Sequence, residues 1–146
     1  MKQKIIIIIL IFLFIILLLT YTIYHKQMIN GEAIKNNKEI EKYTKDVITG
    51  TDLITVINKA IDKNEYNGVS KDSNSKYINN DTNSIKVEVK FLEKEENVSM
   101  ESIYSLGIEE FIKYYSKRSF KCKELKYHNK TKNISYLKFD EVQNDY

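Results

Sequence analysis

The chain has 146 residues and a formal net charge of +3, and four residue types dominate it: 22 Lys, 22 Ile, 14 Asn and 11 Tyr. This length leaves room for one domain with an appendage, and it excludes a two-domain enzyme or a large barrel. The single Cys122 excludes an intrachain disulfide framework and a cysteine-rich zinc site.

The first predicted element is a long apolar helix close to the N-terminus. Residues 5–19 read IIIIILIFLFIILLL, and TYTIY extends the apolar run to residue 24. A helix of this length spans about 30 Å, the thickness of the hydrocarbon core of a bilayer. The two tyrosines at its end fall where an interfacial aromatic belt lies. We therefore predict a membrane-spanning segment. Five positions mark it from end to end: Ile5, Leu10, Phe14, Leu19 and Tyr24.

A cleaved signal peptide is the rival interpretation of this segment. Lys2 and Lys4 precede the apolar core, as they would in a signal peptide, but no small-residue cleavage site follows it. There is also no Cys near the end of the segment to accept a lipid. Positive charge close to a span favours the cytoplasmic side; Lys2 and Lys4 lie on one flank, and Lys26, followed further on by Lys35 and Lys38, lies on the other, so the charge close to the span slightly favours the N-terminal tail. We therefore expect an uncleaved single-pass anchor, with the larger part of the chain outside the cytoplasm.

Two helices are predicted to follow the span. Residues 25–48 carry loosely spaced apolar side chains among many charges, a pattern typical of a helical stalk. Residues 53–61 place five apolar side chains on one helical face, with Thr51 as the candidate N-cap. The dipeptide Asn67-Gly68 is a strong turn signal and is expected to end this second helix.

Short strands and short helices are predicted for the rest of the chain. Residues 85–91 alternate apolar and charged side chains, which indicates a strand with one wet face. A short helix capped by Ser99 and stopped by Gly107 follows, and then a second one. Residues 120–128 and 134–142 flank a five-residue polar loop, the arrangement of a β-hairpin.

The order of these elements predicts an α+β fold. It consists of an N-terminal transmembrane helix with an amphipathic extension, followed by a small antiparallel sheet of about four strands with short helices. The predicted organisation is a basic tail at 1–4, a transmembrane anchor at 5–24, a helical stalk at 25–48 and a small α+β domain at 49–146.

The sequence contains no pattern that predicts catalysis, a cofactor or a metal. On one extended strand Cys122 and His128 lie about 20 Å apart, too far to share a metal or to act as nucleophile and base. We expect a small buried cysteine and an exposed histidine at the end of the strand. The loop 79–83 offers oxygen atoms but lacks the spacing of a calcium loop. We therefore expect a protein that is not an enzyme.

Charge is segregated along the predicted soluble part. Residues 88–110 hold seven acids and two bases, a net charge of −5, whereas residues 113–138 hold nine bases and one acid, a net charge of +8. The basic block, interleaved with tyrosines, is a candidate surface for a protein partner or another copy of the chain. A merely solvated hairpin is the interpretation that the lysine-rich composition favours; the others are lipid headgroups or a surface polymer and, least favoured, nucleic acid. The candidate partner surface comprises Lys113, Lys117, Arg118, Lys121, Lys123, Lys126, Lys130 and Lys132.

A long apolar N-terminal helix, an amphipathic extension and a small antiparallel sheet resemble the plan of type IV pilins and pseudopilins. The resemblance covers the whole chain in the order of its elements and lies in architecture alone. The leader of that family has a Gly at its cleavage point and a Glu five residues into the mature helix, and residues 1–24 contain neither. The resemblance implies a pilin-like or accessory component of an assembly, and no functional residue is carried over.

The sequence as a whole predicts a single-pass membrane-anchored, non-enzymatic protein that presents an extracytoplasmic α+β interaction domain. Its partners would be the lipid bilayer and either a protein or further copies of the chain. The alternative is a membrane-bound ligand-sensing or solute-binding module. A pocket with convergent polar groups would favour the sensor, and a flat charged or apolar patch would favour the assembly component.

Overall fold

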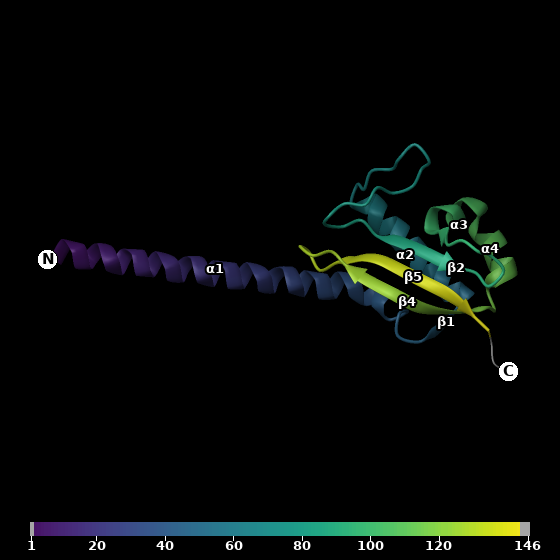
Figure 1. Ribbon diagram of the computed structural model, residues 1–146, viewed down its shortest axis with the longest axis horizontal. Helices are drawn as coiled ribbons and strands as arrows, with labels where there is room; N and C mark the ends of the chain where they lie inside the picture. The colour runs from purple at the N-terminus through teal and green to yellow at the C-terminus, as the bar shows by residue number, and fades with distance from the viewer. Residues whose placement is uncertain (1, 144–146) are drawn as a thin grey trace.

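A single 40-residue helix, α1 (Lys2–Glu41), forms the N-terminal part of the computed structural model, which describes residues 2–143 (Figure 1). Its apolar half projects away from the rest of the molecule, and every side chain from 5 to 24 is exposed. The helix is therefore long and apolar enough to cross a membrane, as predicted.

The last turns of α1 belong to the core of the domain. Ala33, Asn37 and Ile40 follow one another at helical spacing on one face and are all buried, whereas Ile34, which lies off this face, is 70% exposed. The helix ends at Glu41, so the predicted stalk is helical only up to that residue. Its final part is packed against the domain rather than acting as a free connector.

A five-stranded sheet and three further helices follow within the described residues (Figure 1). The α+β class is confirmed. In chain order the elements are β1 (Val47–Thr49), α2 (Gly50–Tyr66), β2 (Lys86–Lys90), β3 (Val98–Ser99), α3 (Met100–Leu106), α4 (Ile108–Tyr115), β4 (Ser119–Tyr127) and β5 (Ile134–Val142).

The sheet is mixed, with the strand order β1-β4-β5-β2-β3. β4 and β5 form the predicted hairpin, but β2 runs parallel to β5, with Lys86 opposite Tyr136 and Lys90 opposite Asp140. The prediction of a purely antiparallel sheet of about four strands was therefore wrong in this detail. The reason is the path of the chain: α2 and the loop after it return the chain to the end of the sheet where β5 begins, so both strands start there (Figure 1).

The sheet has a proximal end and a distal end. The proximal end is where β2 and β5 begin and where the β4–β5 loop points back along α1. The distal end is where these two strands finish (Figure 1). The helices pack on one face of the sheet, which we call the covered face, and the other face is open. The stripe predicted for the second helix lies buried on the covered face, as expected. Its members are Leu53, Val56, Ile57, Ala60 and Ile61.

The ends of the helices match the predicted signals with one exception. Ser99 caps α3, and Gly107, with φ at +93°, ends it. The N-cap of α2 is Thr49 and not Thr51. Thr49 accepts a hydrogen bond from the backbone N–H of Asp52 at 3.2 Å, while the Asp52 carboxylate accepts one from the backbone N–H of Thr49 at 3.2 Å. This reciprocal capping box satisfies two helix-end donors and starts the helix earlier.

Candidate functional site

The basic residues of the candidate partner surface are spread along the domain rather than gathered in one patch. The first three lie at the distal end, the next three along β4, and the last two in the β4–β5 loop at the proximal end. Their environments differ, and the surface as a whole stays a prediction. In that order they are Lys113, Lys117, Arg118, Lys121, Lys123, Lys126, Lys130 and Lys132.

At the distal end, Arg118 is a structural residue. Its guanidinium donates to Glu93 at 3.0 Å and to Glu141 at 2.9 Å, and it lies over the ring of Tyr115 at 4.7 Å. The hydrogen bond to Glu141 raises the pKa of Arg118. Glu141 is itself buried and accepts a bond from the backbone N–H of Leu92 at 3.1 Å. The acidic and basic blocks therefore meet inside one molecule here, and Arg118 already has two carboxylate partners within the chain.

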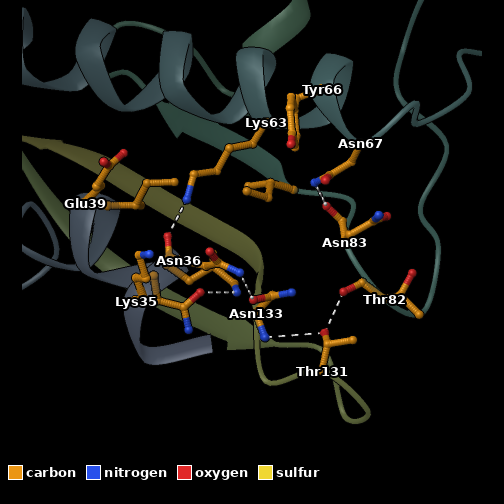
Figure 2. Close-up of a pocket in the computed structure, with 14 residues that line it drawn as sticks. Lys35, Asn36, Glu39, Lys63, Tyr66, Asn67, Thr82, Asn83, Thr131 and Asn133 are labelled. Atoms are coloured by element: carbon orange, nitrogen blue, oxygen red, sulfur yellow. Dashed lines mark hydrogen bonds between the residues drawn. The ribbon is translucent and has the colours of Figure 1, made fainter. Parts of the chain in front are cut away.

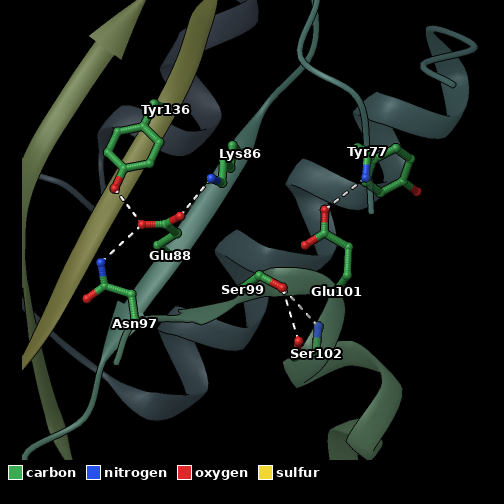
Figure 3. A network of polar contacts seen from close by, with 8 residues as sticks. All are labelled: Tyr77, Lys86, Glu88, Asn97, Ser99, Glu101, Ser102 and Tyr136. Atoms are coloured by element: carbon green, nitrogen blue, oxygen red, sulfur yellow. Dashed lines mark hydrogen bonds and ion pairs between the residues drawn. The ribbon is translucent and has the colours of Figure 1, made fainter. Parts of the chain in front are cut away.

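The open face of the sheet carries a network of paired charges (Figure 3). The carboxylate of Glu88 accepts hydrogen bonds from Tyr136 at 2.8 Å and from Asn97 at 3.1 Å, and it pairs with Lys86 at 2.7 Å. Partial burial acts to raise the pKa of Glu88, but these three partners outweigh it and hold the pKa below its usual value. Around Glu88, on β2 and β5, this face offers a partner little uncompensated charge.

Along β4, the exposed lysines differ in how much of their charge is compensated. Lys126 pairs with Glu124 at 2.8 Å and lies 5.0 Å from the ring centre of Tyr136. Lys121 and Lys123 are also exposed, and no acidic side chain of the described residues lies within salt-bridge distance of either. Along β4, these two lysines are the members of the candidate partner surface with the least compensated charge.

A polar cleft of about 530 Å³ lies at the proximal end between α1, α2 and two loops (Figure 2). Five asparagines from four segments line it, and two hydrogen bonds link four of them across the cleft. Asn36 of α1 donates to the side chain of Asn133 at 3.4 Å, and Asn67 donates to the carbonyl of Asn83 at 3.4 Å. Amides that both donate and accept suit a small polar ligand.

Charged side chains and an aromatic ring line the same cleft. The ammonium of Lys63 donates a hydrogen bond to the backbone carbonyl of Asn36, and burial lowers the pKa of this lysine. A hydrogen bond from Lys59, at 3.2 Å, lowers the pKa of Glu39 on the neighbouring wall. Tyr66 is 91% exposed at the rim. The sequence did not reveal this cleft, because its walls come from segments up to 97 residues apart.

Two buried polar side chains organise the proximal end. Asn37 donates to the carbonyl of Lys132 at 2.8 Å and accepts from the N–H of Ile134 at 2.9 Å, which ties the β4–β5 loop to α1. His128 is also buried, with its Nε2 at 2.7 Å from the carbonyl of Ser84. The prediction of an exposed His128 was wrong, because the loop before β2 covers the ring and supplies a partner for it.

Cys122 lies half-buried against the core, and burial raises the pKa of its thiol. A raised pKa leaves less of the nucleophilic thiolate at neutral pH. Among residues 2–143, no group of three or more His, Cys, Asp or Glu side chains is placed to hold a metal ion. The expectation that the chain has no catalytic, cofactor or metal site remains an expectation.

Comparison with known proteins gives no relative from which residues could be transferred. No protein-family model, no curated protein and no solved structure matches the chain.

Proposed function

We propose that this chain is a single-pass membrane-anchored, non-enzymatic protein. Its α+β domain lies outside the cytoplasm and makes contacts with a protein partner or with further copies of the chain. Lys2 and Lys4 lie ahead of the apolar segment, against Lys26 alone directly after it, and this excess supports a cytoplasmic N-terminus.

The observation that carries the proposal is the continuity of α1. Residues 5–24 of the helix are a fully exposed apolar run, whereas its last turns lie in the core of the domain. Two contacts fasten the helix end: Ile40 is fully buried, and Glu41 accepts a hydrogen bond from the hydroxyl of Tyr127 at 2.8 Å. Burial and the Glu41 carboxylate raise the pKa of Tyr127 to about 12. Such a helix would hold the domain at a fixed height and orientation, as a subunit of an assembly requires.

The pilin-like architecture supports an assembly role in its general form. A long apolar helix followed by a small sheet is the plan of that class. The absence of Gly and Glu from residues 1–24 argues against processing by the family's leader peptidase. We therefore favour an accessory component that keeps its whole N-terminal segment in the membrane over a processed structural subunit.

Two experiments in intact cells test the proposal. Protease added from outside should remove the C-terminal part of the chain, and full protection would reject the orientation. A photo-crosslinking amino acid at position 121 or 123 should give a ladder of copies or one heterologous product. The matched control is position 62, an exposed residue of α2 on the opposite side of the domain. Equal products from all three positions, or none, would reject the interaction surface.

A second function is favoured by the polar cleft, which has the convergent groups expected of a membrane-bound ligand-sensing or solute-binding module. A panel of sugars and amino acids would be added to the purified full chain, and a bound ligand should raise its melting temperature. The variant Asn83→Ala should lose the shift, whereas Asn74→Ala, on an exposed loop away from the cleft, should keep it. A panel without any shift would count against this function.

A further inference from the structure

The loop between β4 and β5 reaches back along α1 to the end of the apolar segment. A hollow of about 430 Å³ is lined on one side by α1 residues from Tyr21 to Asn30 and on the other by Asn129, Lys130 and Lys132. The loop therefore lies beside the first polar turns of the helix and far from the distal end of the domain (Figure 1).

Several hydrogen bonds fix the loop in this position. Asn37 of α1 donates to the carbonyl of Lys132 at 2.8 Å, and Asn36 donates to Asn133 at 3.4 Å. On the other side, Thr131 donates to the carbonyl of Thr82 at 2.5 Å. Lys132 has φ at +59°, a left-handed conformation that these contacts hold in place. These contacts give the loop a defined conformation and hold it beside α1.

The surface formed by the loop and the exit of α1 is basic. Lys26, Lys130 and Lys132 all belong to it and are exposed, and His25 lies beside them. The sequence has no acidic residue from 1 to 31. The nearest acid that the described contacts give is Asp81, 4.0 Å from Lys130, and a pair between two such exposed side chains contributes little.

The height of this surface matches the polar layer of a bilayer. Tyr24 ends the apolar run, and the helix residues from Lys26 to Asn30 that face the loop lie two to six residues later, about 3–9 Å further along the helix axis. The headgroup layer on each side of the hydrocarbon core is about 5–8 Å thick. Tyr21 and Tyr24 are exposed, as interfacial anchors would be. When α1 spans a bilayer, the loop lysines come to the level of the lipid phosphates.

We propose that Lys26, Lys130 and Lys132 form a docking surface for anionic phospholipid headgroups, which holds the domain upright against the membrane. The proposal rests on the proposed function for the insertion of α1 in a bilayer. It goes further, because it makes the loop a second membrane contact. It also removes Lys130 and Lys132 from the candidate protein-partner surface. Each lysine near an anionic surface is expected to strengthen the contact about five-fold.

The test uses the full chain in vesicles, with Cys122→Ser as background and a fluorophore on a single introduced cysteine. The positions are Asn129→Cys in the loop, Leu13→Cys in the span and Glu95→Cys in the β2–β3 loop at the distal end. A nitroxide on the lipid headgroup quenches fluorophores at the surface. The vesicles contain phosphatidylcholine alone or with about a third of phosphatidylglycerol, at low and at high salt.

The expected result is strong quenching at 129, at least two-fold greater with phosphatidylglycerol and reduced by salt, and none at 95. The double variant Lys130→Gln with Lys132→Gln should lose the dependence on anionic lipid. The matched pair Lys117→Gln with Lys121→Gln, away from the proximal end, should keep it.

The three labels separate the possible failures. A label at 13 that lies in the hydrocarbon, together with an unquenched label at 129, would overturn the headgroup surface alone. Quenching at 129 that is the same with and without phosphatidylglycerol, and is changed by neither double variant, would overturn it as well. A label at 13 that remains in water would reject the anchor of the proposed function and the headgroup surface with it.

Discussion

Alternate residues of the same strands lie in opposite environments on the two faces of the sheet. On the covered face Val87 of β2 is opposite Leu137 of β5, and both are fully buried. One position further, on the open face, Glu88 is opposite Lys138. The covered face is a packed apolar core, whereas the open face is a set of ion pairs and hydrogen bonds in contact with water (Figure 3).

This difference separates the residues that stabilise the domain from the residues that a partner could contact. Apolar burial gives about 25 cal/mol for each Å² removed from water, whereas exposed ion pairs contribute at most about 1 kcal/mol. The covered face therefore decides whether the domain folds. On β2 and β5 the open face is electrically balanced, whereas the basic groups with least compensation lie along β4 and at the proximal loop, where we place the proposed contacts.

The sharpest test of the comparison is a truncation on the covered face beside one on the open face. Phe139→Ala removes a fully buried ring and should lower the free energy of unfolding by about 4 kcal/mol. Its neighbour Lys138→Ala, on the open face, should change it by less than about 0.5 kcal/mol. Urea unfolding of the full chain in detergent, followed by near-ultraviolet circular dichroism, measures both. Similar losses from the two variants would contradict the division between the faces.

The second prediction concerns how closely the helices of the covered face approach each other. A Cβ added at Gly50, the first residue of α2, would lie 1.8 Å from the carbonyl oxygen of Tyr115 at the end of α4. The two helix ends must separate, and Gly50→Ala should cost about 3 kcal/mol in the same unfolding experiment. The control is Gly31→Ala in α1, where no atom lies within 4 Å of the added Cβ and no loss is expected. A neutral Gly50→Ala would show that this contact is looser than described.

The third prediction concerns a polar side chain buried among the apolar residues of the covered face. Asn64 of α2 is fully buried and bonds both backbone groups of Ile85, accepting from its N–H at 2.7 Å and donating to its carbonyl at 2.8 Å. Asn64→Ala leaves both groups buried without a partner, and we expect a loss of about 2 kcal/mol. Exchange of the Ile85 amide with deuterium should accelerate as well. Unchanged exchange would mean that water replaces the side chain.

Local signals in the sequence were enough to predict much of this fold. The hairpin was expected at 120–128 and 134–142, and the strands occupy Ser119–Tyr127 and Ile134–Val142. The buried stripe of α2 and the Ser99 cap were also expected and are confirmed. Periodicity and caps depend on neighbours within a few positions of the chain, which one sequence displays directly.

Features that depend on distant segments could not be predicted in this way. β1 and β3 have three and two residues, too few for an alternating pattern to emerge. The parallel pairing of β2 with β5 depends on where α2 brings the chain, and the burial of His128 depends on Ser84, 44 positions away. The cleft likewise joins α1 to the loop around Asn133. None of these contacts leaves a local trace in the sequence.

The smallest predicted effect lies on the open face and depends on pH. Since the pKa of Glu88 is lowered in the folded state, its carboxylate stabilises the fold above the unfolded pKa of about 4.3, and this contribution is lost as the pH falls through the folded pKa. Glu88→Gln should therefore cost about 1 kcal/mol at neutral pH and almost nothing in acid. Tyr136→Phe, which removes the donor at 2.8 Å, should reduce the pH dependence without abolishing it. Urea unfolding at a series of pH values measures both. A loss from Glu88→Gln that stays constant down to acid pH would show that packing, and not charge, is what Glu88 supplies, and the open face would then resemble the covered one more closely than we describe.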